Sequence, residues 1–171
     1  MIASVAGFIK DHEVWAAPLG FALAFGESLA FISLLLPATA ILLGVGILIG
    51  ASEISFLPIW LAAALGAGLG DWTSYWIGRR FGGAILGVWP LSRHAGVLPR
   101  AHAPFARWGM AGVFIGRFLG PLRAVVPLLA GISSMPQGRF QFANFTSAFL
   151  WAAAVLAPGN WGFRWIETML A

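Results

Sequence analysis

Charged side chains stand inside the apolar stretches of this 171-residue sequence. Arg117 and Arg123 flank the short segment 118–122 within an otherwise apolar run, and Glu27 lies in the apolar stretch 21–36. A guanidinium keeps its proton, and its planar fork of N–H donors suits bidentate pairing with phosphate. The two arginines are therefore candidates for binding an anionic lipid headgroup, with Glu27 lining the same substrate site.

Glu27 and Asp71 are candidates for proton coupling, because both are carboxyl groups in apolar segments. A carboxylate at the bilayer centre costs about 2.5 to 3.5 kcal/mol on insertion scales, so something must offset its charge. Structural alternatives remain open. Glu27 would lie near an interface or bond the broken backbone around Pro37, and Asp71 would be a salt-bridge partner. The arginines would then pair with these acids or extend to the interface, and a substrate could still displace such a counter-ion.

Groups that could support catalysis are sparse. The chain has no cysteine, which excludes disulfides, thiol nucleophiles and cysteine-bound metals. Its three histidines, His12, His94 and His102, lack the spacing of metal ligands, and no Ser/His/Asp set is apparent. The sequence therefore predicts neither an enzyme nor a bound metal or other cofactor.

The composition indicates a membrane protein. The chain is 60% hydrophobic and 9% charged, with a mean hydropathy of +0.87, whereas soluble domains carry about 25% charged residues. The arginines lie between apolar runs and the net charge is only +4, so we interpret them as membrane charges and predict no nucleic-acid partner. The first residues lack the features of a cleaved signal peptide.

Two apolar segments are predicted to cross the membrane. Residues 57–78 would form a helix of about 33 Å, enough for the hydrocarbon core of about 30 Å, and form the clearest crossing. Residues 140–156 form the second, bounded by Arg139 and Pro158. Residues 81–105 mix apolar and basic residues and are expected to lie at the membrane interface.

Two further segments, 14–51 and 105–134, are apolar but interrupted by charges, glycines and prolines. Each is predicted to be a re-entrant hairpin that enters the membrane and returns to its own side. Residues 14–36 alone are long enough for a full crossing, and the sequence leaves that alternative open. The predicted hairpin tips are Pro37 in the first segment and Gly120 and Pro121 in the second.

A hairpin followed by a crossing helix thus occurs twice. Because each of these helices takes the chain across the membrane, the two hairpins must enter from opposite membrane faces. The predicted fold is an all-α integral membrane protein with a single domain over residues 1–171, built from two inverted re-entrant hairpins that are each followed by a transmembrane helix. One face is rich in arginine and is expected to be cytoplasmic. It carries Arg79, Arg80, Arg93, Arg100, Arg107 and Arg139.

Glycines recur at spacings that favour close helix packing. One set has a period of four residues and would line one helical face, and the other precedes Asp71. Small residues let two backbones approach closely in a membrane, so packing is the expected role of both sets. The sets are Gly112, Gly116 and Gly120, and Gly66, Gly68 and Gly70.

An ordered set of motifs resembles the DedA family, also called the SNARE-associated or VTT-domain family. The most specific part spans residues 105–140, and Gly70-Asp71, Tyr75 and a glutamate ten residues before Pro37 support it. The resemblance covers roughly residues 20–163. The specific motifs are Phe105-Ala-Arg107-Trp-Gly109, Val113-Phe-Ile-Gly-Arg117-Phe-Leu-Gly-Pro121-Leu-Arg123, Ala130-Gly131, Met135-Pro136 and Arg139-Phe140.

The resemblance implies two re-entrant hairpins, multi-pass residence in the bacterial inner membrane, dependence on the proton motive force, and functional roles for Glu27, Arg117 and Arg123. It also implies transport of phospholipids or polyprenyl phosphates between leaflets. One departure bears on coupling: many members follow the hairpin proline with glycine and an acid, where this chain has Ala38 and Thr39. Many relatives continue into another helix, so the chain is expected to be a short member or a truncated one.

The sequence therefore predicts a lipid transporter of flippase type. It would move undecaprenyl phosphate or a phospholipid between leaflets, with proton coupling as an option and with the membrane and an anionic lipid as partners. A homo-oligomer is compatible with the sequence. The alternative is a membrane scaffold or envelope-stress protein that transports nothing.

Overall fold

The computed structural model describes residues 13–29, 42, 55–82, 84, 108–119, 123 and 125–170, with side chains placed as far as Pro158. The regular elements within these ranges are helices, and no strand occurs among them, in agreement with the predicted all-α class. The predicted hairpin tips Pro37, Gly120 and Pro121 lie outside the described residues, as does most of the predicted interfacial segment 81–105.

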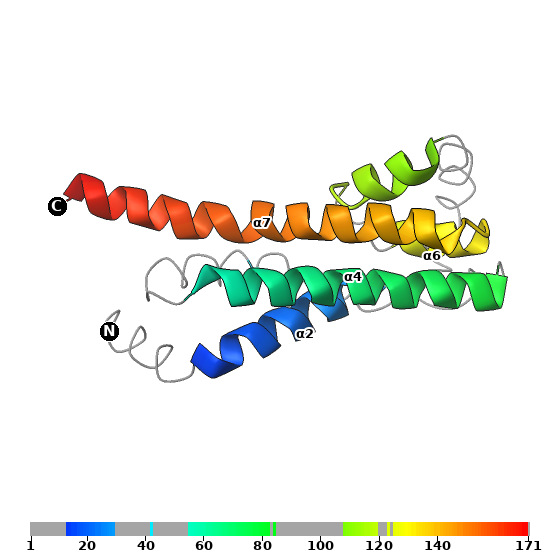
Figure 1. The fold of residues 1–171 in the computed structure, drawn as a ribbon, viewed down its shortest axis with the longest axis horizontal. Coiled ribbons are helices and arrows are strands. Elements are labelled where there is room, and N and C mark those ends of the chain that lie inside the picture. The colour runs from blue at the N-terminus through cyan, green and yellow to red at the C-terminus, as the bar shows by residue number, and fades with distance from the viewer. Residues whose placement is uncertain are drawn as a thin grey trace.

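Two long antiparallel helices form the frame of the molecule (Figure 1). Helix α4 (Phe56–Phe81) has 26 residues and α7 (Gln137–Leu170) has 34, so at about 1.5 Å per residue both exceed the thickness of a hydrocarbon core. Helix α7 continues beyond its predicted end at Leu156, through Pro158. Proline is tolerated within membrane helices, where neighbouring groups can satisfy the freed carbonyl.

The two long helices differ in how apolar they are. Among the described residues, the part of α7 from Gln137 to Pro158 is both long and apolar enough to cross a membrane, with a mean hydropathy of 1.4. Helix α4 covers the predicted crossing 57–78 but does not meet the same criterion. Its glycines, Asp71 and the terminal Arg79 and Arg80 reduce its apolar character, so the crossing predicted over residues 57–78 stays a prediction.

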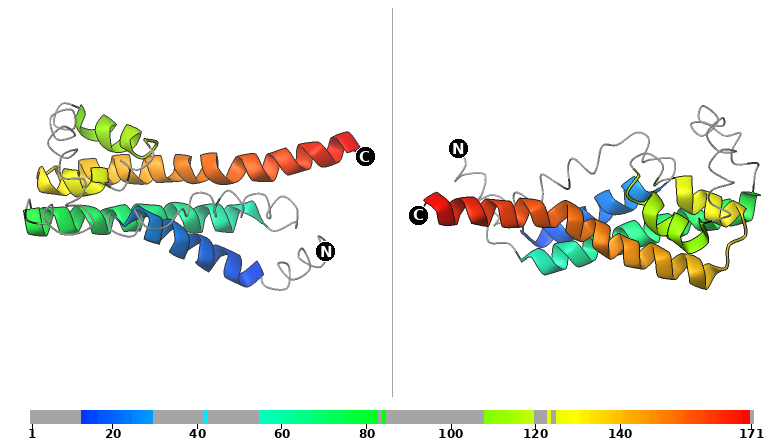
Figure 2. Two further views of the ribbon diagram at one scale, coloured as in Figure 1. Left: turned by 180° about the vertical axis from the view of Figure 1, so that it is seen from behind. Right: turned by 90° about the horizontal axis from the view of Figure 1, so that it is seen from above.

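Two shorter helices enter the molecule from opposite ends and finish near its middle (Figures 1 and 2). Helix α2 (Ala16–Ser28), preceded by the single turn η1 (Glu13–Trp15), starts at the end where α4 begins. The helix over residues 108–116 starts at the opposite end. Helix α6 (Val125–Ile132) then leads to the turn before α7. The described part of residues 14–51 is mainly α2, so the returning arm of the first predicted hairpin lies outside it.

Basic residues of both long helices lie at the same end of the molecule. Arg79 and Arg80 occupy the last turn of α4, and Arg139 lies in the first turn of α7. Because the two helices are antiparallel, these residues lie at the same end of the molecule (Figure 1). This arrangement agrees with the prediction that they share one membrane face.

Glycines let the short helices approach the backbone of α4. A Cβ atom at Gly66 or Gly70 would collide with the carbonyl oxygen of Phe21 or Phe25 in α2, and one at Gly78 would collide with the backbone of α6. A larger residue at these positions would force the helices apart. The predicted packing role is therefore confirmed for the glycines before Asp71, and Gly116 of the second set packs on Val126.

Two apolar clusters leave a gap along the frame that polar residues fill. On α4 the first cluster runs from Ile59 to Ala67, and the second includes Tyr75, which stacks on Phe140 of α7 with 4.3 Å between ring centroids. The polar side chain of Asp71 lies between them on α4. Asn144 and Ser147 occupy the corresponding stretch of α7, and both are fully buried.

Candidate functional site

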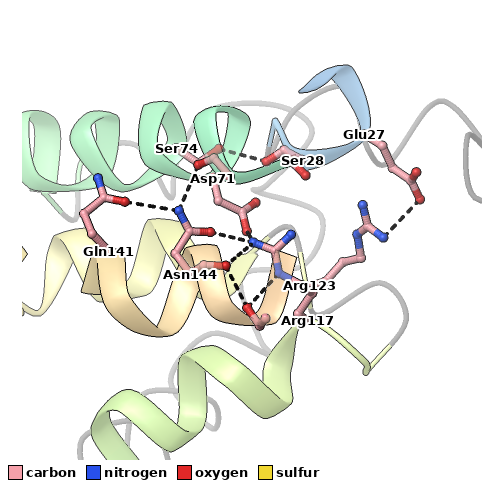
Figure 3. Close-up of polar contacts among 10 residues, drawn as sticks. Glu27, Ser28, Asp71, Ser74, Arg117, Arg123, Gln141 and Asn144 are labelled. Atoms are coloured by element: carbon pink, nitrogen blue, oxygen red, sulfur yellow. Dashed lines mark hydrogen bonds and ion pairs between the residues drawn. The ribbon is translucent and has the colours of Figure 1, made fainter. Parts of the chain in front are cut away.

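Four buried charges meet where the short helices end (Figure 3). Glu27 comes from the last turn of α2, Asp71 from α4, and Arg117 from the turn after the helix over residues 108–116; Arg123 precedes α6. Their exposed fractions are 5%, 6%, 4% and 8%. All four residues that the sequence singled out for substrate binding or proton coupling therefore belong to one site.

Arg117 forms the centre of a hydrogen-bonded network. Its Nη2 donates to Asp71 in a buried ion pair and to Oδ1 of Asn144, and its Nε donates to Oγ of Ser147 at 2.9 Å. A buried guanidinium needs partners for its fork of donors, because an unpaired buried charge is costly. Here the partners come from both long helices, so Arg117 joins α4 to α7.

Asn144 extends this network across the frame. Its Nδ2 donates to the carbonyl oxygen of Gly68 on α4 at 2.8 Å and to Oε1 of Gln141, one turn away on α7, at 3.3 Å. Ser147 donates its Oγ proton to the carbonyl oxygen of Asn144 at 3.0 Å. The amide thus serves as acceptor and donor at once and fixes the orientation of the Arg117 fork.

Arg123 has a different and looser environment. Its Nη1 lies 3.4 Å from Oε1 of Glu27, and its guanidinium carbon lies over the indole ring of Trp151, 4.3 Å from the ring centroid. The buried Nη2 has no hydrogen-bond partner within the described part of the chain. Stacking on an aromatic face stabilises a guanidinium without using its in-plane donors, so Arg123 is stabilised but retains an N–H group for a further acceptor.

A second contact ties the end of α2 to the site. Ser74, one turn after Asp71 on α4, donates its Oγ proton to the carbonyl oxygen of Ser28 at 3.2 Å. Ser28 follows Glu27 in the chain and is also buried. The hydrogen bond therefore fixes the helix end that carries Glu27 against the helix that carries Asp71.

The internal pairing that the sequence offered as a structural alternative is present: Arg117 pairs with Asp71, and Arg123 pairs with Glu27. Two cations and two anions give the site a formal charge of zero. Such a site can accept an external anion only if one internal carboxylate is displaced or protonated. Within the described residues, no three His, Asp or Glu side chains lie close enough together to hold a metal ion.

Several residues of the site escaped sequence reasoning. Their helical spacing was a usable signal on α7, because polar residues at three-residue intervals in an apolar helix share one face. Trp151 carries no comparable signal, since the chain contains nine tryptophans. The residues concerned are Gln141, Asn144, Ser147 and Trp151 on α7, Ser74 on α4 and Ser28 on α2.

The apolar composition, the long antiparallel helices and the buried ion pairs define a helical integral membrane protein. Residues 36–160 match the VTT domain, and the chain belongs to the VTT-domain family, which is the DedA family. No solved structure matches it at a significant level.

Curated relatives agree with this assignment. The chain is 35% identical to the inner membrane protein YabI of Escherichia coli K12 over 93% of its own length and 63% of that protein. It is 36% identical to the inner membrane protein YghB of the same organism over 81% of its own length and 64% of that protein. An uncharacterized membrane protein of Buchnera aphidicola is 31% identical, over 89% of the chain and 59% of that protein.

These matches place the chain among bacterial inner-membrane proteins, as the sequence predicted. The chain spans about three fifths of the length of these relatives.

Proposed function

We propose that this protein moves a phosphate-bearing lipid, undecaprenyl phosphate or a phospholipid, between the leaflets of the bacterial inner membrane, and that it forms no covalent intermediate. The observation that carries the proposal is the pair of buried ion pairs, Arg117 with Asp71 and Arg123 with Glu27. Charges deep in a membrane protein are costly and mark substrate or ion pathways.

In this proposal α2 and the helix over residues 108–116 are the entering arms of two inverted re-entrant hairpins. Both finish at the buried charges. Transporters built from inverted repeats bind substrate near the midplane, between discontinuous helices. A headgroup could then reach the site from either leaflet as one arm or the other moves relative to the frame.

Proton coupling fits the same geometry. Protonation of Glu27 would remove the negative charge opposite Arg123, which frees the guanidinium for a phosphate. Loss of the proton would restore the pair and favour release of the phosphate. Asp71 is the second candidate proton carrier, but its partner Arg117 is held by two further side chains, so we assign the coupled step to Glu27.

The test is lipid movement by purified protein in unilamellar liposomes. Fluorescent phosphatidic acid and fluorescent glucosylceramide supply matched probes with and without phosphate, and protein-free liposomes give the background. We expect faster movement of phosphatidic acid only. Equal rates for both probes would contradict phosphate recognition, and a rate at background for both would favour a scaffold that transports nothing.

A further inference from the structure

Resting on the proposed function, we infer that the two buried arginines have different roles: Arg123, positioned by the indole of Trp151, contacts the lipid phosphate, and Arg117 is a positioning residue that holds α4 to α7. Arg117 and Arg123 are the same residue type and are buried to nearly the same extent. Only their surroundings distinguish them.

Two of the three donor nitrogens of Arg117 are already committed to side chains of the two long helices. Its Nε and Nη2 donate to Ser147, Asn144 and Asp71, which come from two different helices. A phosphate that replaced Asp71 would still have to share Nη2 with Asn144. Binding through Arg117 would therefore break the link that this side chain makes between the two long helices.

Arg123 can bind an anion with less rearrangement. Its ion pair with Glu27 has an N–O distance of 3.4 Å, longer than the 2.7 to 2.9 Å of a strong charge-assisted hydrogen bond. Its buried Nη2 lacks a hydrogen-bond acceptor among the described residues. An entering phosphate oxygen would supply that acceptor and could replace Glu27 at Nη1, giving the bidentate geometry that guanidinium favours.

Trp151 is the residue that would keep Arg123 in place during this exchange. Its side chain is 5% exposed and packs in the first apolar cluster, so the ring has a fixed position on α7. The ring attracts the cation whether or not Glu27 is paired with it. It contributes no competing acceptor, so it leaves the in-plane N–H groups of Arg123 available to a phosphate.

The experiment measures both phosphate affinity and stability in the purified full chain. Two probes are titrated separately, dioctanoyl phosphatidic acid and inorganic phosphate. Trp151→Leu removes the aromatic face, Trp151→Phe retains one, and Ser147→Ala removes one acceptor of Arg117. Trp60→Leu is the matched control, since Trp60 also packs against the first cluster but contacts Phe149 rather than a charged residue.

Without the ring the guanidinium of Arg123 is no longer held in the binding position, and an entering phosphate must order it. If that ordering costs as much as a cation–π contact in a desolvated site supplies, the affinity falls by about 5- to 30-fold. We expect Trp151→Leu to weaken phosphatidic acid binding by about that factor, and Trp151→Phe by about 2- to 4-fold. Ser147→Ala should lower the thermal midpoint and change the affinity less than about 2-fold. Trp60→Leu should lower the midpoint without changing affinity. Inorganic phosphate should bind the parent more weakly than phosphatidic acid.

Equal affinities in Trp151→Leu and Trp60→Leu would overturn the role of Trp151. A loss of affinity in Ser147→Ala as large as that in Trp151→Leu would overturn the division between the arginines. Failure of the proposed function is distinguishable from both: the parent would then bind phosphatidic acid no better than inorganic phosphate.

Discussion

Replacing Asn144 by alanine should loosen the contact between α4 and α7 and reorient Arg117. The variant removes Oδ1 of Asn144, which accepts from Arg117, and Nδ2 of Asn144, which donates to the carbonyl oxygen of Gly68; Asn144 is fully buried. A hydrogen bond to a charged group contributes about 1.5 to 3 kcal/mol. An interhelical bond in a membrane contributes about 0.6 to 1.7 kcal/mol. The expected loss in the free energy of unfolding is therefore about 2 to 5 kcal/mol.

The measurement is reversible unfolding in mixed micelles, followed by circular dichroism, for Asn144→Ala and for Thr146→Ala. Thr146 is the matched control, because it lies on the same helix, is exposed, and donates only to the carbonyl oxygen of Phe142 in its own helix. We expect Thr146→Ala to cost less than about 0.5 kcal/mol. The reasoning would be refuted if the two variants unfolded at the same denaturant concentration.

Three further outcomes are expected. Gly78→Ala should destabilise the protein by about 1 to 3 kcal/mol, since its Cβ would press on the backbone of α6. Gly138→Ala in α7 should be neutral or slightly stabilising, because there is open space around that position. Thermal unfolding of the two variants in detergent tests this difference. Glu27→Gln should fold yet move lipid more slowly, with a flattened dependence of rate on pH, and pH profiles parallel to the parent's would exclude Glu27 as the proton carrier. The chain has no cysteine of its own, so a cysteine introduced at position 139 would be the single thiol in the variant. It should resist a membrane-impermeant thiol reagent added outside intact cells. Rapid labelling would reverse the assigned orientation.

The helical class and the site charges were predictable from sequence because both depend on strong local signals. A charge in an apolar run must find a partner, and only four such groups were prominent: Glu27, Asp71, Arg117 and Arg123. Their meeting therefore follows from the cost of burying them apart. The glycines before Asp71 gave a similar signal, since a small-residue surface in a membrane helix favours close packing.

Which acid each arginine pairs with, and which other side chains surround it, was not predictable. Arg117 and Arg123 are the same residue type in the same motif, and their difference depends on which side chains of α7 face each one. That choice is set by the rotation of α7 against α4, a tertiary property that spacing within either helix does not reveal. The end of α7 was also mispredicted, because Pro158 was interpreted as a helix stop, and a membrane helix can continue through proline.

The central claim, that the phosphate of a lipid enters the buried site, is tested most directly by photo-crosslinking. A phosphatidic acid with a diazirine beside its phosphate is irradiated with the protein in liposomes, and the labelled peptides are mapped by mass spectrometry in the presence and absence of unlabelled phosphatidic acid. Labelling should occur on α7 around Trp151, should be competed by the unlabelled lipid, and should be lost in Arg123→Gln. Labels confined to the basic ends at Arg79, Arg80 and Arg139, and unchanged in Arg123→Gln, would contradict the account.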